Sequence, residues 1–516
     1  MVNKLKNLIG ICGDVAYRKY AARYRRIRKK EKYKSIDFFI EYLNHLGNNV
    51  TPNSECEKVR NRIISEICTL DSVYTSFHFS KDCACLVSDE ATAKKAMDRG
   101  ALVLITPKDY AKYPCLISND PLGVFSDLCL YFRNLKKNMP ITAITGSIGK
   151  TTIKNMVGEV YKMKYKTSYT QSNINTRMAV GFAVQHIPDW AEIMIQEIHE
   201  GSPNITQYVS RMLHPSTFII TPIDLSHFQY FGSKEKIEEE ICSVTKYMAD
   251  GSIVIVNIDD FSRFDLLEGR KIITTSTQTQ KADYWAKGTI VENDGLVFSI
   301  VDNKTQKEYE IRLSNIYAPH NASCALYAFA AGMCANIPPQ DIVKGLMNYR
   351  TSGERQNIFR TNNGILVYAD CYNAVGKSMK SAINAASNIP TSGKRIAVLG
   401  DMAEVGSESE QMHKEITEMV NNSSFDYLFT IGSEFEKAIN KVSLRKTMTV
   451  KTTQSHAELN KMILNTAKQG DLVLFKASHS SNLSDCIKTI WPKEYRHYIK
   501  PAYTEYSMWE RESLRY

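Results

Sequence analysis

The sequence predicts an α/β protein with three domains, on three observations. First, 516 residues exceed what one hydrophobic core normally organises, since domains usually hold about 100–200 residues. Second, short runs of branched residues alternate with helical segments over 141–350 and again from 351, a pattern typical of mostly parallel sheets. Third, the stretch ITAITGSIGKTTIKNM, which starts at Ile141, has the pattern of a strand, a glycine-rich turn and a helix.

The domain limits follow from changes of pattern along the chain. Residues before Cys83 are basic and then polar, with helical spacing, whereas buried-strand candidates such as ALVLITP come after it. Strands such as RIAVLGD and DLVLFKAS predict a second doubly wound, Rossmann-like sheet near the C-terminus. The predicted segments are a basic helical extension (1–80), a small α/β domain (81–137), a central phosphate-loop domain (138–350), a Rossmann-like domain (351–490) and an aromatic, basic tail (491–516).

The composition is that of an ordinary globular protein. Hydrophobic residues make up 43% and charged residues 23% of the chain, and no apolar run approaches the roughly 18–20 residues that cross a bilayer. Twelve cysteines are scattered without a CxxC pair, so neither a zinc site nor a disulfide framework is indicated. We therefore expect a soluble, cytoplasmic protein with reduced thiols.

The net charge of +10 is unevenly distributed. Much of the excess lies in YRKYAARYRRIRKKEKYK, from Tyr17 to Lys34, where tyrosines recur at helical spacing. Such a segment suits docking on an anionic membrane surface or on nucleic acid. The alternative, which we favour, is a solvated helix that packs its tyrosines on the body of the protein or on a partner subunit. Nucleic acid is not an expected partner.

The glycine-rich turn carries the strongest chemical signal. Converging backbone N–H groups before a helix form an anion site, which a lysine and a hydroxyl complete for a nucleoside triphosphate with magnesium. Lys150 would reach the β- and γ-phosphates, and Thr151 would ligate the metal. Ile144 stands where the general pattern G-x-x-x-x-G-K-[ST] has its first glycine. The predicted nucleotide-binding residues of the turn are Gly146, Ser147, Gly149, Lys150, Thr151 and Thr152.

Seven further stretches, in order along the chain, follow the pattern of one family. They are SNINTRMAVGF (172–182), IDLSHFQYFGSKEKI (223–237), APHNASCALYAFAAG (318–332), SGERQNI (352–358), YADCYNAVGKSMKSAI (368–383), RIAVLGDMAEVGSESEQMH (395–413) and LFKASHS (474–480). Together with the variant turn TGSxGKT[ST], they resemble the ATP-dependent muramyl-peptide ligases, or Mur ligase family, over about residues 83–485. The branch that the chain resembles most joins D-alanyl-D-alanine to a UDP-muramyl tripeptide.

The resemblance implies a fold and a reaction. The fold would have a small N-terminal α/β domain, a central P-loop ATPase domain and a C-terminal Rossmann-like domain. The reaction would use ATP and magnesium to phosphorylate an acceptor carboxylate, after which the amine of an amino acid or dipeptide forms an amide. The implied pathway is the synthesis of cell-wall peptidoglycan precursors.

The resemblance also implies a metal and phosphate site. Glu197 would be the second metal carboxylate, with Gln196 in its place if the alignment slips by one; a solvated strand-end acid is the alternative. His227 matches the family's histidine near the metal. The implied catalytic residues are Lys150, Glu197, His227 and Arg355, and the implied metal ligands are Thr151, Glu197 and His227.

The remaining nucleotide contacts would come from two separate segments. Asn321 would meet the adenine edge, with His320 beside it, unless both simply cap their helix. Arg355 would reach the phosphates and Asp370 the ribose or its linker. Both roles require the third domain to close over the site and exclude water.

Three residues are candidates for substrate contacts. Asn173 and Asn175 would touch the bound acceptor, or else form a turn. Lys476, at a predicted strand end, would meet the carboxylate of the incoming amine component, or else be an ordinary surface lysine.

The chain departs from the family pattern at three points. The carbamylated lysine that commonly binds metal is replaced by Ile241, and the preceding Glu240 is a candidate substitute carboxylate. DCYNAVGKSM has Val-Gly for the usual Asn-Pro, and KASHS has Ala and His for Gly and Arg. No segment that would grip UDP is evident in residues 1–80.

These departures leave alternatives open. A related ligase could act on another cell-envelope glycan or peptide. A scaffold that binds nucleotide without ligase chemistry is a rival of a different class, and a P-loop ATPase that uses its basic arm on nucleic acid is a third.

Overall fold

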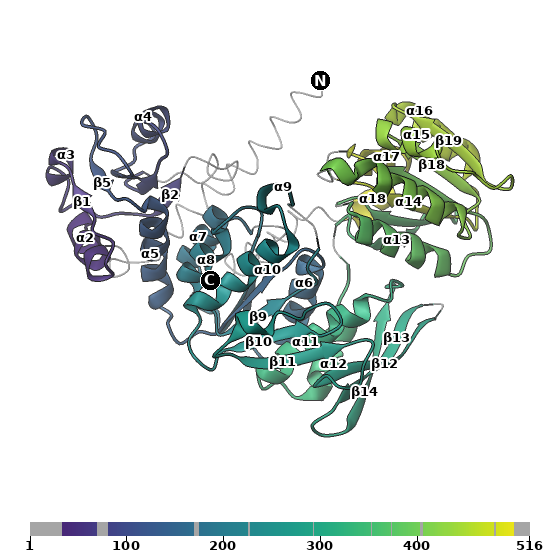
Figure 1. Ribbon diagram of the computed structural model, residues 1–516, viewed down its shortest axis with the longest axis horizontal. Helices are drawn as coiled ribbons and strands as arrows, with labels where there is room; N and C mark the ends of the chain where they lie inside the picture. Colours follow the sequence, from purple (N-terminus) through teal and green to yellow (C-terminus); the bar gives the residue numbers. More distant parts are fainter. Residues whose placement is uncertain are drawn as a thin grey trace.

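The computed structural model describes residues 34–69, 81–169, 175–224, 228–292, 294–351, 353–372, 374–402, 406–478 and 481–499. They form three α/β units, each built around its own sheet (Figure 1). The central unit lies between the other two, and the first and third units stand at opposite ends of the molecule (Figure 1). This is the predicted α/β class. None of the described helices combines the length with the apolar character that a membrane crossing needs.

The first unit has a five-stranded sheet that is parallel except at one edge, where β1 runs antiparallel to β5. In spatial order its strands are β1 (Thr51–Pro52), β5 (Cys115–Ile117), β4 (Val103–Thr106), β3 (Ala84–Leu86) and β2 (Ile67–Thr69). Its helices are α2 (Ile36–His45), α3 (Ser54–Glu57), α4 (Glu90–Asp98) and α5 (Pro121–Asn134).

The domain boundary predicted at residue 80 does not match the structure, because it cuts through this sheet. Strands β1 and β2 both precede residue 80, yet both pair with strands that follow it. Strands of two and three residues are too short to show a sequence period, and their partners are distant in the chain. The segment predicted as a separate extension therefore supplies both edges of the first sheet.

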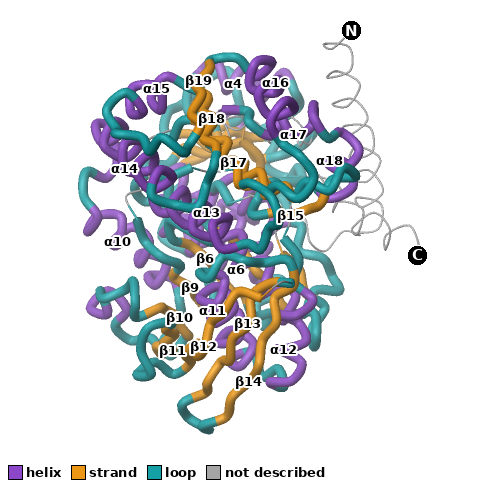
Figure 2. Tube along the Cα trace, turned by 90° about the vertical axis from the view of Figure 1, so that its right-hand side faces the viewer, coloured by secondary structure: helices purple, strands orange, loops and turns teal. Residues whose placement is uncertain are grey.

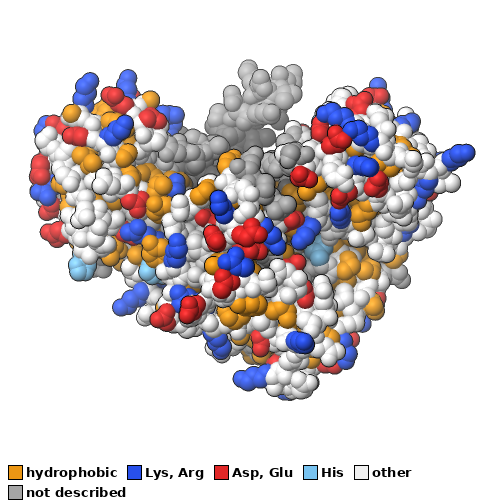
Figure 3. Space-filling view, in the orientation of Figure 1, with side chains coloured by type: hydrophobic (Ala, Val, Ile, Leu, Met, Phe, Trp, Pro, Cys, Tyr) orange, Lys and Arg blue, Asp and Glu red, His pale blue; other side chains and the backbone are white. Residues whose placement is uncertain are grey.

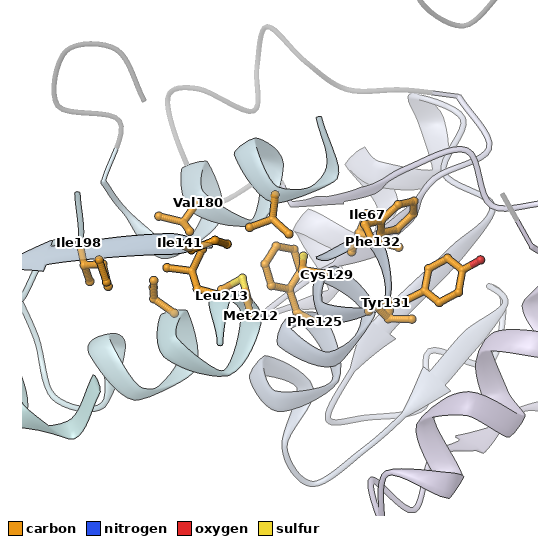
Figure 4. Packing of buried hydrophobic residues seen from close by; sticks show 14 of the residues in the cluster. Ile67, Phe125, Cys129, Tyr131, Phe132, Ile141, Val180, Ile198, Met212 and Leu213 are labelled. Carbon is orange, nitrogen blue, oxygen red and sulfur yellow. The ribbon is translucent and has the colours of Figure 1, made fainter. Parts of the chain in front are cut away.

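Helix α5 joins the first unit to the central one. It is buried continuously from Gly123 to Arg133, and it packs against α7 (Arg177–Gln185) and α8 (Ile205–Leu213) of the central unit. Figure 4 shows Phe125 and Cys129 of α5 between the side chains of both units. The two units therefore share one hydrophobic core.

The central unit has a nine-stranded sheet. Its parallel part carries helices on both faces, and β12–β14 extend it as an antiparallel end. In spatial order the strands are β14 (Lys307–Ser314), β13 (Gly295–Asp302), β12 (Tyr284–Glu292), β11 (Lys271–Ser276), β10 (Ile253–Asn257), β9 (Thr217–Ile220), β6 (Ile141–Thr145), β8 (Ile193–Glu197) and β7 (Thr167–Tyr169). The remaining helices are α6 (Lys150–Tyr161), α9 (Phe228–Phe231), α10 (Lys234–Cys242), α11 (Asn321–Cys334), α12 (Pro339–Asn348) and the 3₁₀ helices Ser243–Tyr247 and Phe264–Leu267.

Alternation along each central strand assigns its side chains to two cores. In β9, Ile219 joins the core under α6, α11 and α12, whereas Phe218 and Ile220 join the core under α7, α8 and α10. Successive strand residues face opposite sides of a sheet, so a run that is apolar throughout marks a strand buried on both faces. Strands β6 and β8 are parallel neighbours in this sheet, so their carboxyl ends lie side by side.

The third unit is a six-stranded sheet, parallel apart from β15. The strand order is β15 (Asn357–Arg360), β16 (Leu366–Asp370), β20 (Leu472–Lys476), β17 (Arg395–Gly400), β18 (Tyr427–Ile431) and β19 (Thr449–Thr453). Its helices are α13 (Gly376–Asn388), α14 (Ser409–Asn421), α15 (Ser433–Ile439), α16 (His456–Thr466), α17 (Ser484–Ile490), α18 (Pro492–Tyr498) and the 3₁₀ helix Gly406–Glu408. In Figure 2 the helices of this unit lie at one end of the molecule and β12–β14 at the other.

The predicted tail at 491–516 begins inside this third unit. Trp491 is buried against Phe475, with ring centroids 6.0 Å apart, and Tyr498 stacks on Phe359 at 5.4 Å. Large aromatic side chains bury much apolar surface, so the first part of the tail belongs to the folded core. Residues 500–516 lie outside the described residues, as does the basic segment up to residue 33.

Candidate active site

The glycine-rich turn between β6 and α6 can be built only with glycine at two positions. Gly146 has φ +135°, and a Cβ there would lie 2.3 Å from Thr221 Oγ1. Gly149, the residue before α6, has φ +84°, a left-handed conformation that side chains disfavour. The turn therefore approaches the end of β9 closely and then starts the helix, whose first backbone amides have no acceptor within the helix.

The other turn residues are held in place by neighbouring backbone and side chains. The amides of Ser147 and Ile148 donate to the Pro222 carbonyl at 3.0 and 3.1 Å. The Ser147 hydroxyl donates to the Asp224 carbonyl at 3.1 Å. The Thr152 side chain bonds to the hydroxyl of Tyr349, which follows α12.

The Lys150 ammonium group is paired with a second acidic residue. It donates to both Glu200 carboxylate oxygens, at 2.8 and 2.9 Å, and also to the Gly146 carbonyl. Glu200 is 1% exposed and lies three residues beyond the end of β8. Glu200 is not among the residues predicted from the sequence.

Glu197, at the end of β8, contacts the hydroxyl that was expected to bind metal. The Thr151 hydroxyl donates to Glu197 Oε2 at 2.9 Å, and Asn175 Nδ2 donates to Glu197 Oε1 at 2.9 Å. Gln196 instead bonds to the Glu197 carbonyl. Of the two residues left open by the sequence, the structure brings Glu197 to Thr151.

A buried lysine keeps Glu197 anionic. Lys154 Nζ lies 3.4 Å from Glu197 Oε2, and both side chains are almost completely buried. Burial acts to raise the pKa of Glu197, but the charges of Lys154, Arg355 and Lys150, with the Asn175 hydrogen bond, hold that pKa below its ordinary value. The site thus holds a carboxylate that stays charged inside the protein.

Of the other metal candidates, Glu240 lies among the described residues. Both oxygens of Glu240 accept hydrogen bonds at the start of α8, from the amides of Asn204 at 2.7 Å and Thr206 at 2.9 Å. A carboxylate at a helix N-terminus satisfies groups that the helix cannot. The structure therefore gives Glu240 a capping role and does not support it as a substitute metal ligand. His227 lies outside the described residues, as does Asn173.

Asn321, the predicted adenine contact, forms a hydrogen bond with the segment that connects the central and third units. Asn321 Nδ2 donates to the Ala318 carbonyl at 3.1 Å and to Gln356 Oε1 at 3.0 Å. Gln356 also bonds to His320 Nε2 at 3.0 Å, and His320 Nδ1 bonds to the Ser381 hydroxyl at 2.6 Å. Both residues at the start of α11 therefore contact the third unit or the segment that leads into it.

The two predicted contacts from the third sheet bind each other. Lys476 Nζ lies 2.9 Å from Asp370 Oδ2, and the two residues are register partners in β20 and β16. Lys476 is 1% exposed, which rules out the alternative of an ordinary surface lysine. Arg355 stacks on Tyr372, with its guanidinium carbon 3.4 Å from the ring centroid, and its charge acts on Glu197.

Known proteins share both the sequence pattern and the fold. Residues 144–332 match the Mur ligase middle domain, and residues 354–479 match the glutamate ligase domain of Mur ligases. The UDP-N-acetylmuramoyl-tripeptide–D-alanyl-D-alanine ligase of Bacillus subtilis is 30% identical over 395 residues, which cover 74% of this chain and 82% of the relative. The chain belongs to the Mur ligase family.

Solved structures of the family superimpose on this Mur ligase. MurF from Acinetobacter baumannii matches with a TM-score of 0.75 at 20% identity, over 89% of this chain and 99% of the other. The MurF ligase from Thermotoga maritima, in complex with ADP, matches with a TM-score of 0.67 at 20% identity, over 82% of this chain and 96% of the other. The predicted Mur ligase fold is confirmed.

The site of this Mur ligase fits a nucleotide with magnesium. The turn offers backbone amides, the Lys150 ammonium group and the Thr151 hydroxyl. The oxygens of Thr151 and Glu197 are donors of the kind that magnesium prefers, and magnesium usually takes its other ligands from water and phosphate. Within the described ranges no cluster of three or more His, Cys, Asp or Glu residues could hold a metal.

Three residues of the site were missed from the sequence. Lys154 follows Lys150 by four residues and so shares its helix face, a signal that could have identified it. Glu200 and Gln356 lie in irregular segments, where no period relates them to the turn. Their places depend on the tertiary fold.

Proposed function

We propose that this Mur ligase uses ATP with magnesium to join D-alanyl-D-alanine to a UDP-muramyl tripeptide in the cytoplasm, during synthesis of peptidoglycan precursors. The family is one of ligases, and the Bacillus subtilis relative is named for this reaction. The observation that carries the proposal is the cluster of charged and polar groups at the carboxyl ends of β6 and β8, where Lys150 bonds to Glu200 and Thr151 bonds to Glu197. In open parallel sheets, this edge is where ligands bind.

The reaction must bring two anions together, the terminal phosphate and the acceptor carboxylate. When bound, ATP with magnesium would supply the phosphoryl group that converts this carboxylate into an acyl phosphate. The incoming amine would then attack the acyl carbon and displace inorganic phosphate, which leaves the amide. Lys150 binds phosphate oxygens and offsets their charge. Thr151 and Glu197 orient the cation, while Lys154 keeps Glu197 ionised and Asn175 fixes the rotation of its carboxylate.

The third unit contributes from the other side of the site. Arg355 is close enough to Glu197 for its charge to lower the pKa of that carboxylate. The first residues of the third unit therefore lie near the proposed metal ligands. Asp370 and Lys476 lie at adjacent strand ends of the same unit. We propose that they face the nucleotide linker and the incoming carboxylate once the unit closes, which excludes water from the acyl phosphate.

The test is a coupled assay of ADP release with mass spectrometry of the product. Release should require both UDP-muramyl tripeptide and D-alanyl-D-alanine, and Lys150→Ala should reduce it by at least about a hundredfold, the loss typical of a removed transition-state donor. ADP release that needs neither substrate, with no amide product, would contradict the proposal.

A second candidate is the same chemistry on another cell-envelope peptide or glycan. It is favoured by the altered start of α13, where Val375 and Gly376 replace the Asn-Pro of the branch that the chain resembles. The assay separates the two candidates if acceptors and amines are varied independently. Turnover with a different pair, and none with D-alanyl-D-alanine, would favour the second.

A further inference from the structure

Lys150 is bonded to Glu200, although the proposed reaction needs the same ammonium group to bind phosphate. Both Glu200 oxygens accept hydrogen bonds from the Lys150 ammonium group, at 2.8 and 2.9 Å. Among the described residues, Lys150 is the partner of this carboxylate. The same ammonium group is the one that nucleotide phosphates require, so nucleotide and Glu200 compete for it.

Burial makes this competition strong. Glu200 is 1% exposed and Lys150 14% exposed, so water compensates neither charge well. Removing one partner from a buried ion pair leaves an uncompensated charge, which is strongly destabilising. A phosphate chain that draws Lys150 away therefore leaves the buried Glu200 carboxylate without its cation. The phosphates also place further negative charge beside that carboxylate.

Glu197 is in a different position, although it belongs to the same site. It keeps Thr151, Asn175 and Lys154 as partners when Lys150 turns to a phosphate. Glu200 has no comparable set among the described residues. A divalent cation that arrives with the nucleotide would supply the missing positive charge, and its attraction acts through space without a direct bond.

We propose that Glu200 is a positioning residue that makes nucleotide binding dependent on magnesium. It holds Lys150 in place before the nucleotide binds, opposes binding of the metal-free nucleotide, and tolerates the magnesium complex. The inference rests on the proposed function in one respect, that nucleotide phosphates bind at this turn. In energetic terms, Glu200 adds a coupling free energy between nucleotide and cation.

The experiment measures the dissociation constant of ADP by calorimetry, in EDTA and in excess magnesium, for wild type and Glu200→Gln. The variant should bind metal-free ADP about tenfold more tightly than wild type, and its gain in affinity from magnesium should be about tenfold smaller. Glu159→Gln is the matched control, because Glu159 lies on the same helix as Lys150 but forms a partly exposed pair, at 2.6 Å, with Lys162, which follows that helix. The control should behave as wild type.

Two further variants keep the test decisive. Glu200→Asp retains the charge and should retain most of the magnesium dependence. Glu200→Ala is a second neutral variant, for use if Glu200→Gln does not fold by circular dichroism, and it should lose the same dependence. Unchanged magnesium dependence in a folded neutral variant would overturn the inference, even if ligase activity is normal. Failure of the wild type to bind ADP in either buffer would overturn the proposed function as well.

Discussion

Glu197 is negatively charged inside the protein because neighbouring cations outweigh its burial. Its pKa lies below the ordinary value of 4.5, as burial raises it less than Lys154, Arg355 and Lys150 lower it. A carboxylate with a depressed folded-state pKa stabilises the fold at pH values above its unfolded-state pKa. That stability is lost as the pH falls through the folded-state value.

This balance predicts the effect of Lys154→Met. The variant removes the largest favourable charge, so the pKa of Glu197 should rise and stability should be lost at a higher pH than in wild type. The measurement is the midpoint of thermal unfolding, followed from neutral to acidic pH. Lys162→Met, directly after the same helix and outside the site, is the control and should leave the profile unchanged. A profile for Lys154→Met identical to that of wild type would contradict this account.

The pair of Asp370 and Lys476 predicts a double-mutant cycle. Lys476→Met should lower the free energy of unfolding by about 3–5 kcal/mol, because it leaves the buried Asp370 carboxylate without its cation. Adding Asp370→Asn should recover part of that loss, since the remaining group is neutral. Urea denaturation of the two single variants and the double variant provides the measurement. Strictly additive losses would show that the two residues do not interact.

At the scale of elements, α5 is the structural joint between the first and central units. Phe125 is 1% exposed and lies against Gly181 of α7, where an added Cβ would come within 2.8 Å of the ring. The glycine therefore lets the two helices approach closely. A helix this deeply buried belongs to both units at once.

Phe125→Ala should accordingly loosen the joint. The cavity should lower the free energy of unfolding by about 3–5 kcal/mol, and hydrogen exchange should accelerate in both α5 and α7. Leu135→Ala is a suitable control, because Leu135 follows α5 but is exposed. Faster exchange confined to the first sheet would indicate that the two units do not share a core.

The predicted elements show where sequence patterns suffice. Apolar runs such as that of β9 predicted central strands because both faces of those strands are buried. The strands β1 and β2 were missed because two or three residues carry no period. Where a strand is this short and its partner strand is distant in the sequence, tertiary packing and not local residue preference decides the pairing.

At the scale of the whole molecule, the third unit is held to the central one by a polar contact and an apolar one. His320 bonds to Ser381, while Tyr317 and Ala318 pack into the core of the third unit. Desolvation, aided by the charge of Lys476 and opposed by Asp370, lowers the pKa of His320 to about 4. The imidazole is therefore neutral near pH 7, and this contact does not titrate there.

Ser381→Ala should weaken the attachment of the third unit. Proteolytic cleavage between Tyr349 and Asn357, the connection between the units, should become faster, because the His320 contact no longer restrains the third unit. Ser387→Ala is the control, since the Ser387 hydroxyl bonds within its own helix, to Ile383, at 2.8 Å. Equal cleavage rates in the two variants would contradict this role for His320.

Charge on the molecular surface bears on the rival functions. On the face that Figure 3 shows, Lys and Arg side chains are interspersed with Asp and Glu over the described units. Binding to nucleic acid generally needs a surface of one sign. That face does not favour the nucleic-acid alternative, and the basic arm at Tyr17–Lys34 lies almost entirely outside the described residues.

The sequence by itself determined the class of fold, the phosphate turn and the family, because each depends on local order: runs of apolar residues, glycines at set positions, and long contiguous signatures. Only the tertiary structure placed Glu200 on Lys150, Lys154 beside Glu197, and Lys476 on Asp370. Such pairs form where separate segments are buried together, and burial is what forces charges to find partners. No local pattern records which partner that will be.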